Sequence, residues 1–257
     1  MLLHTHISGQ TDNNVLPVVL IHGLFGSYEN LGVIARSLSE QYRVINVDVR
    51  NHGRSAHSSE MNYSLMAEDL AQTLDALSID KAAILGHSMG GKMAMAFALK
   101  YPQRVSKLIL ADIAPVGYPP RHNAIIAGLS AVDMATLENR NDADKQLAHY
   151  IAEAGVRQFL LKSLVKEDAG FHWRFNLDAL KQNYAELIAA PLQDGKFEGP
   201  TLFIKGGDSD YILPEHKATI MQLFPNAQAK IIQGTGHWLH AEKPAAFTKL
   251  VNDFLLS

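Results

Sequence analysis

One serine stands between two glycines where a strand-like run meets a helix-forming run. The apolar run Ala82–Leu85 leads into Gly-His-Ser-Met-Gly at positions 86–90, and the helix-forming run Met93–Lys100 follows. This order predicts a strand, a sharp turn with Ser88 at its apex, and a helix. A strained turn leaves no room for side chains beside the serine, which explains the glycines at both ends of the pentad.

The pentad follows the G-x-S-x-G pattern of a nucleophile elbow. Its turn puts Ser88 at a helix N-terminus, where backbone N–H groups and the helix dipole favour negative charge. The oxyanion formed during acyl transfer carries such a charge. A glycine-rich loop that matched the pattern by chance would lack the strand before it and the helix after it. We therefore predict that Ser88 is a nucleophile.

Strand-like apolar runs alternate with helix-forming segments along most of the chain. The runs are Val18–His22, Val44–Val47, Ala82–Leu85, Leu108–Ala111, Leu202–Lys205 and Ala229–Ile232. Several are continuously apolar, which is typical of strands buried on both faces of a parallel sheet. Helices are expected over Leu31–Glu40, Ser64–Leu77, Met89–Tyr101, Glu215–Phe224 and Pro244–Leu256. The sequence thus predicts an α/β fold, with a mostly parallel central sheet flanked by helices.

The alternation breaks between residues 118 and 190, where no strand core is evident. Amphipathic segments fill this stretch, at Asn123–Val132, Ala143–Ala154, Val156–Val165 and Leu177–Ile188. We expect Asp142 and Asn176 to be helix N-caps. Because the insertion follows a predicted strand, we expect it to cover the carboxyl edge of the sheet, where ligands bind in open α/β folds. The predicted organisation is a core of residues 1–117 and 191–257, with a helical cap of residues 118–190.

A nucleophilic serine needs a base, and the chain has 12 histidines to choose from. His237 lies just after the last predicted strand, on a loop freed by Gly234 and Gly236. It also fits the chain order of serine, acid and histidine that accompanies this kind of elbow. We therefore predict that His237 is the base. His240, three residues on, is expected to be a helix-approach or surface residue.

Two aspartates are candidates for the acid that orients His237. Asp210 follows the predicted strand Leu202–Lys205, at the place where the common Gly-x-x-Asp pattern puts its acid. Asp112 directly follows the predicted strand Leu108–Ala111. Both would lie at carboxyl ends of strands on the same edge of the sheet, within reach of the imidazole. The spacing alone does not choose between them.

The oxyanion donors are expected to be backbone groups. His-Gly-Leu-Phe-Gly at positions 22–26 follows the first buried strand. One donor should be the N–H of Met89, the residue after the nucleophile, and the other the N–H of Leu24. His22 is expected to be a structural, hydrogen-bonding residue of this loop.

Composition excludes several other kinds of site and partner. The formal net charge of −3 gives no electrostatic case for binding nucleic acid or an anionic membrane. Cysteine is absent, which excludes thiol nucleophiles and thiolate metal sites. No dinucleotide fingerprint or metal-ligand spacing is evident, so we expect no cofactor and no metal. With no signal-like N-terminus and no apolar run long enough to span a bilayer, we expect a cytoplasmic protein without membrane insertion.

Six motifs are spread over nearly the whole chain. They lie at residues 22–27 (His-Gly-Leu-Phe-Gly-Ser), 48–53 (Asp-Val-Arg-Asn-His-Gly), 86–92 (Gly-His-Ser-Met-Gly-Gly-Lys), 112–115 (Asp-Ile-Ala-Pro), 173–176 (Trp-Arg-Phe-Asn) and 236–244 (Gly-His-Trp-Leu-His-Ala-Glu-Lys-Pro). Together they resemble the bacterial YbfF-type esterases of the α/β-hydrolase superfamily. The Arg-Asn-His-Gly at 50–53 is more specific than the usual Arg-Gly-x-Gly of the superfamily.

The resemblance implies an α/β-hydrolase fold with a small helical cap inserted after the sixth strand. It also implies esterase and acyl-CoA thioesterase activity, so the expected partner is a small-molecule ester or acyl-CoA substrate. In this family the acid follows the sixth strand, which corresponds to Asp112, and the segment matching residues 206–212 typically lacks an aspartate. This chain departs from that pattern at Asp210. Asp112 is therefore the predicted acid, and Asp210 stays the alternative.

The function that we expect is a serine hydrolase that cleaves esters or thioesters through an acyl-enzyme. One alternative is a lyase or a carbon–carbon bond hydrolase on the same fold, and another is a non-catalytic ligand receptor. Lys92 is expected to pack its aliphatic stem against the protein, and the alternative is that it binds an anionic substrate. Arg121 and His122 are expected to be solvated residues of the cap, and the alternative is that they contact a charged acyl carrier such as coenzyme A. Acyl chain length, ester or thioester preference and oligomeric state are left open.

Overall fold

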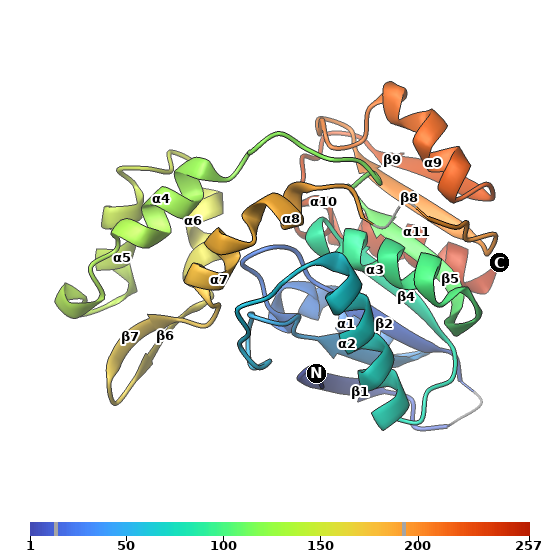
Figure 1. Cartoon of the computed structure of the whole chain (residues 1–257), viewed down its shortest axis with the longest axis horizontal. Coiled ribbons are helices and arrows are strands. Elements are labelled where there is room, and N and C mark those ends of the chain that lie inside the picture. The colour runs from blue at the N-terminus through green and yellow to red at the C-terminus, as the bar shows by residue number, and fades with distance from the viewer. Residues whose placement is uncertain (13–14, 192–193) are drawn as a thin grey trace.

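Seven strands form one sheet at the centre of the protein (Figure 1). The computed structural model describes residues 1–12, 15–191 and 194–257. The order across the sheet is β1-β3-β2-β4-β5-β8-β9. All neighbours pair in parallel except β1, which runs antiparallel to β3. The strands are β1 (Thr5–Gly9), β2 (Pro17–Ile21), β3 (Arg43–Val47), β4 (Ala82–His87), β5 (Val105–Ala111), β8 (Thr201–Gly206) and β9 (Ala227–Ile232).

Helices cover both faces of this sheet. The main ones are α1 (Gly32–Leu38), α2 (Tyr63–Ala76), α3 (Met89–Lys100), α9 (Lys217–Leu223), α10 (Leu239–Glu242) and α11 (Pro244–Leu256). Short 3₁₀ turns accompany them at η1 (Tyr28–Leu31), η2 (Pro102–Arg104) and η4 (Pro214–His216). The predicted α/β class and mostly parallel sheet are confirmed. The predicted closing helix has the same bounds as α11, whose first residue is a proline, as is common at N1.

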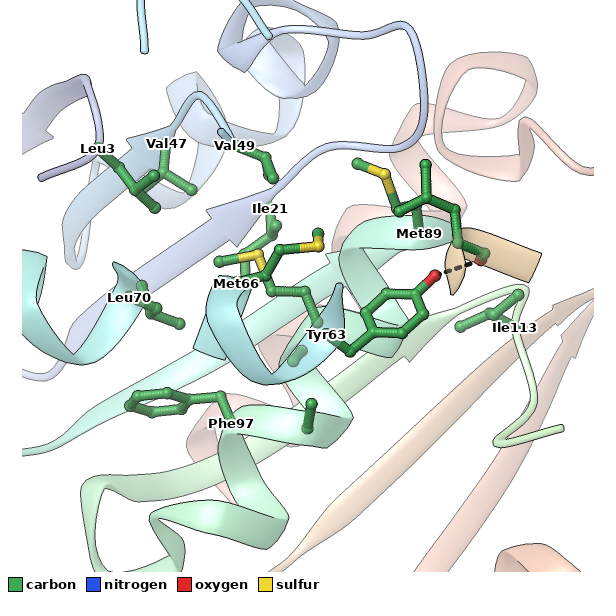
Figure 2. Packing of buried hydrophobic residues seen from close by; sticks show 14 of the residues in the cluster. Leu3, Ile21, Val47, Val49, Tyr63, Met66, Leu70, Met89, Phe97 and Ile113 are labelled. Atoms are coloured by element: carbon green, nitrogen blue, oxygen red, sulfur yellow. Dashed lines mark hydrogen bonds between the residues drawn. The ribbon is translucent and has the colours of Figure 1, made fainter. Parts of the chain in front are cut away.

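The continuous apolar strands separate two hydrophobic clusters. In β2, Val19 and Ile21 belong to the cluster beneath α2 and α3, whereas Val18 and Leu20 belong to the cluster beneath α1 and α11. Figure 2 shows the first cluster, where Ile21 lies near Met66 of α2. Successive side chains point to opposite faces of a strand, so a strand covered on both faces is apolar at every position.

The edge strand β1 gives no comparable signal in the sequence. Its residues are partly or fully exposed, and it pairs only with β3. Because one face and one edge meet solvent, its side chains need not be apolar. It is therefore not among the predicted strands.

As far as the structure describes it, the insertion between β5 and β8 adds no strand to the central sheet, and Figure 1 shows it gathered at one side of the core. It holds five helices, a 3₁₀ turn and a hairpin: α4 (Asn123–Ala131), η3 (Met134–Thr136), α5 (Arg140–Leu147), α6 (Ala154–Leu161), β6 (Leu164–Glu167), β7 (Gly170–Trp173), α7 (Leu177–Gln182) and α8 (Tyr184–Ile188). We call residues 118–190 the cap. Within the described residues, no helix of the core or the cap is both long and apolar enough to cross a membrane.

Three expectations for the cap were wrong. It follows the fifth strand along this chain, not the sixth, because four strands, β1–β4, precede β5. It is not purely helical, since β6 and β7 form an antiparallel pair whose turn ends at Gly170, with φ of 111°. Asp142 is not an N-cap but the third residue of α5, where it completes a capping box with the N-cap Asn139. Asn176 does cap α7, as predicted.

Candidate active site

Ser88 lies at the turn between β4 and α3. Its backbone has φ of 54°, a left-handed conformation that residues other than glycine seldom adopt. A Cβ atom at Gly86 would lie 2.2 Å from the carbonyl oxygen of Gly90, and one at Gly90 would lie 2.3 Å from that of Ile21. The two glycines are therefore required by close backbone approach, as the sequence predicted.

Three side chains form a hydrogen-bonded line at the carboxyl edge of the sheet. The Ser88 hydroxyl donates to Nε2 of His237 at 2.9 Å. On the other side of the ring, Nδ1–H donates to Oδ2 of Asp112 at 2.8 Å. A carboxylate only accepts hydrogen bonds, so this contact assigns the proton to Nδ1 and leaves Nε2 free to accept.

Asp112 is fully buried and held by two further donors. The backbone N–H of Gly206 donates to Oδ1 at 2.9 Å, and the Ser209 hydroxyl donates to Oδ2. Both come from the end of β8 and the loop after it. This loop therefore orients the carboxylate that faces His237. Ser209 was not identified from the sequence, where its neighbour Asp210 drew attention instead.

Asp210 lies elsewhere, with its side chain 67% exposed. Its Oδ1 accepts a hydrogen bond from the Arg121 guanidinium at 2.5 Å, and this bond holds the pKa of Asp210 below its ordinary value. The structure thus brings together Ser88, His237 and Asp112, and places Asp210 in an ion pair with the cap.

The Asp210–Arg121 pair still bears on His237, through an aromatic ring. Tyr211 stacks on the imidazole of His237 with centroids 3.7 Å apart and planes inclined by 13°. The Arg121 guanidinium lies over the Tyr211 ring, 4.7 Å from the centroid of that ring. This stack restricts the plane of the His237 ring from one face. Only the position of Tyr211 beside the candidate acid could have indicated it.

Two narrow cavities meet at Ser88, each with a volume of about 30 Å³. Leu24, Ser88 and the cap residue His122 line both. The remaining lining of the first includes Met89, Lys92, Tyr118, Arg121, Ile188 and Tyr211, and that of the second Phe25, Ile125, Val156, Phe159, His237 and Trp238. Core and cap therefore enclose the serine jointly.

Lys92 is 2% exposed, one turn after Ser88 on α3. Its ammonium donates to the carbonyl oxygens of Ile188 at 3.0 Å and Ala189 at 2.6 Å, and lies 4.7 Å from the centroid of Tyr118. Burial lowers the pKa of Lys92 to about 7. Its hydrogen bonds thus tie the end of the cap to the elbow helix.

Four histidines around this site are buried: His22, His52, His87 and His240. Burial lowers the pKa of each, to about 3 for His52 and His240. His240, expected as a helix-approach or surface residue, is instead enclosed within α10, and its Nδ1 has no hydrogen-bond partner in the described chain. All four rings are therefore neutral at neutral pH.

We expect these buried rings to make the fold sensitive to acid. In the unfolded chain a histidine binds a proton near pH 6.5, so the stability due to a neutral buried ring is complete above that pH. It is lost as the pH falls from about 6.5 toward 3. Between pH 7 and pH 5, His52 and His240 should each remove about 2 kcal/mol from the free energy of unfolding. Urea unfolding at the two pH values measures this loss.

The variant His240→Leu removes one of these groups at similar volume. In this variant, the free energy of unfolding that is lost between pH 7 and pH 5 should be smaller than in the wild type by about 2 kcal/mol. Equal losses of unfolding free energy in His240→Leu and in the wild type would contradict the assignment of His240 as a buried, neutral ring.

Known proteins resemble this chain over nearly its whole length. Residues 17–244 match the family model described as alpha/beta hydrolase fold. Esterase YbfF of Escherichia coli (strain K12) is 43% identical over 96% of both chains. The sn-1-specific diacylglycerol lipase ABHD11 of Mus musculus is 42% identical over 95% of this chain and 82% of its own length. A solved structure titled "Marine microorganism esterase" superposes with a TM-score of 0.95 at 36% identity, covering 98% of this chain and 99% of that one.

Proposed function

We infer the activity from one premise, that this chain belongs to the alpha/beta hydrolase family, in the group of esterases and lipases that contains YbfF and ABHD11. We propose that it cleaves carboxylic esters and acyl thioesters through an acyl-enzyme on Ser88, with His237 as base and Asp112 as orienting acid. The observation that carries the proposal is the line of hydrogen bonds from Asp112 through His237 to Ser88. That line supports the role in proton transfer that we propose for each group.

In the first half of the reaction, Oγ of Ser88 attacks the substrate carbonyl while its proton passes to Nε2 of His237. The N–H groups of Leu24 and Met89 hold the resulting oxyanion. Met89 is the first residue of α3, so its N–H has no acceptor one turn earlier in the helix. The carbon–oxygen or carbon–sulfur bond then breaks, and the leaving group takes the proton from His237.

In the second half, His237 takes a proton from water and the hydroxide oxygen attacks the acyl carbon. The bond between the acyl carbon and Oγ of Ser88 then breaks, Oγ takes the proton back from His237, and the carboxylic acid leaves. Asp112 stays ionised throughout and stabilises the imidazolium that forms twice in the cycle.

The two cavities at Ser88 suit the two sides of a scissile bond, one for the acyl group and one for the leaving group. Both are narrow, with a volume of about 30 Å³ each, and cap residues line both. The name of the mouse relative, a diacylglycerol lipase, is consistent with an uncharged ester as substrate.

A matched pair of substrates tests the proposal, namely p-nitrophenyl butyrate and butyryl-CoA. Both should be hydrolysed, with the ester turned over at about 1 s⁻¹ or faster. Added methanol should divert the same fraction of both substrates to methyl butyrate, because both form the same butyryl-enzyme. Gas chromatography measures the ratio of methyl butyrate to butyrate.

Three results would count against the proposal in different ways. Unequal product ratios would contradict a common acyl-enzyme. Turnover of the ester alone would remove the thioester from the proposal. Tight binding of both compounds without turnover would favour a ligand receptor.

A further inference from the structure

The loop that carries the expected oxyanion donor Leu24 is fixed at the next residue, Phe25. Phe25 is 2% exposed and has φ of 62°, a left-handed conformation that an aromatic residue rarely adopts. Its N–H donates to Nε2 of His52 at 3.1 Å, and its carbonyl oxygen accepts from the Ser163 hydroxyl at 3.0 Å. Such a conformation persists only where surrounding contacts enforce it.

The core holds this loop with two imidazoles. Nδ1–H of His52 donates to the carbonyl of Arg50 at 3.0 Å, which leaves Nε2 to accept from Phe25. Nδ1–H of His22 donates to the carbonyl of Gly23 at 2.8 Å, and Nε2 accepts from the N–H of Val49 at 3.1 Å. The peptide groups on both sides of Leu24 are thus restrained from the core.

The cap holds the same loop through Ser163 and Phe175. Ser163 lies between α6 and β6, is 3% exposed, and accepts at its carbonyl from the N–H of Arg174. The Phe175 ring packs edge-on against Phe25 with centroids 5.3 Å apart. The backbone N–H of Asn176 donates to the carbonyl of Asn51 at 2.9 Å. Two motifs for which the sequence predicts no role, at 50–53 and 173–176, therefore meet around Phe25.

We propose that Ser163 is a positioning residue of the oxyanion hole, through which the cap completes the active site by fixing Phe25 and thereby the N–H of Leu24. The inference rests on the proposed hydrolase function. Oxyanion donors act at 2.7–3.1 Å from the developing charge, and a displacement of about 1 Å can lower the rate about 100-fold. A hydroxyl that restrains Phe25, the residue after Leu24, therefore affects the transition state without contacting the substrate.

Two variants of the same shape isolate the hydroxyl, Ser163→Thr and Ser163→Val. With p-nitrophenyl butyrate, Ser163→Val should lower kcat about 10-fold relative to Ser163→Thr, with KM unchanged within about 3-fold. A purely structural role would lower thermal stability in both variants and would not separate kcat from KM. Ser130→Val, at an exposed position of the cap helix α4, is the control and should match the wild type.

Hydrogen exchange gives a second readout that needs no turnover. The peptide covering residues 22–27 should exchange faster in Ser163→Val than in Ser163→Thr, because the restraint on Phe25 is lost. Equal kcat and equal exchange in the two variants would overturn the proposal while leaving the hydrolase function intact. A wild type that forms no acyl-enzyme would overturn the hydrolase function, and with it the role of Ser163 in catalysis, whereas a difference in exchange would still establish the restraint.

Discussion

Replacing Ser88 by alanine is expected to lower kcat for p-nitrophenyl butyrate about 10⁶-fold, which is the size of effect seen when a serine protease loses its nucleophile. The hydroxyl at the elbow donates to His237, and no other hydroxyl in the described chain donates to that ring. Without Oγ the acyl-enzyme cannot form, and only slow attack by water remains. Steady-state hydrolysis measures the loss.

A fluorophosphonate probe checks the same residue independently of turnover. Mass spectrometry should find the probe on the peptide that contains Ser88 in the wild type, and no adduct in Ser88→Ala. Thermal unfolding should show that the variant is folded, since alanine keeps the Cβ atom that serine already places in this turn and adds no bulk. Residual activity above about 1% of wild type, or an adduct on another serine, would reject Ser88 as the nucleophile.

Replacing Asp112 by asparagine is expected to lower kcat about 10⁴-fold, the effect of the corresponding change in a chymotrypsin-type triad. The Gly206 N–H and the Ser209 hydroxyl would hold the new amide in the place of the carboxylate, with its oxygen toward Gly206. Its NH₂ group would then face Nδ1 of His237 as a donor. The imidazole would carry its proton on Nε2 and could no longer accept the proton of Ser88.

Asp210→Asn is the matched control for this change. Asp210 is largely exposed and pairs with Arg121, so its loss should loosen the stack on Tyr211 and lower kcat by no more than a few-fold. The two variants together decide which carboxylate supports His237. A 10⁴-fold loss in Asp210→Asn with near-normal activity in Asp112→Asn would reassign the acid.

Features that depend on local sequence were predictable. The pentad around Ser88 predicted a strand, a turn and a helix, and β4 and α3 have that arrangement because glycine alone fits at 86 and 90. The continuous apolar runs predicted buried parallel strands because both faces of each must be covered. The likeness to YbfF-type esterases was predictable because its motifs are spread along the chain, and the 43% identity to Esterase YbfF confirms it.

Features that depend on contacts between distant segments were not predictable in this way. Asp112 and Asp210 occupy equivalent places at the ends of strands, and the difference between them lies in partners from other segments, His237 for one and Arg121 for the other. The β6–β7 hairpin was missed because its strands are four residues long, and a short apolar run fits a helix equally well. The stack of Tyr211 on His237 joins two loops that have no shared sequence pattern.

The hydrogen bonds at the base of the cap have a consequence for how this enzyme family can diversify. Where the chain leaves the core, the N–H of Tyr118 donates to the carbonyl of Ile188, close to where the chain returns. Tyr63 and Lys92 hold the returning segment at Leu187, Ile188 and Ala189. Exit and return thus lie side by side, so insertions, deletions or exchange of the intervening segment leave the strand order untouched. The cap can therefore change in length and sequence while the sheet and the turn at Ser88 keep their structure, and on our proposal such a change keeps the oxyanion hole in place only where the new cap supplies a donor to Phe25.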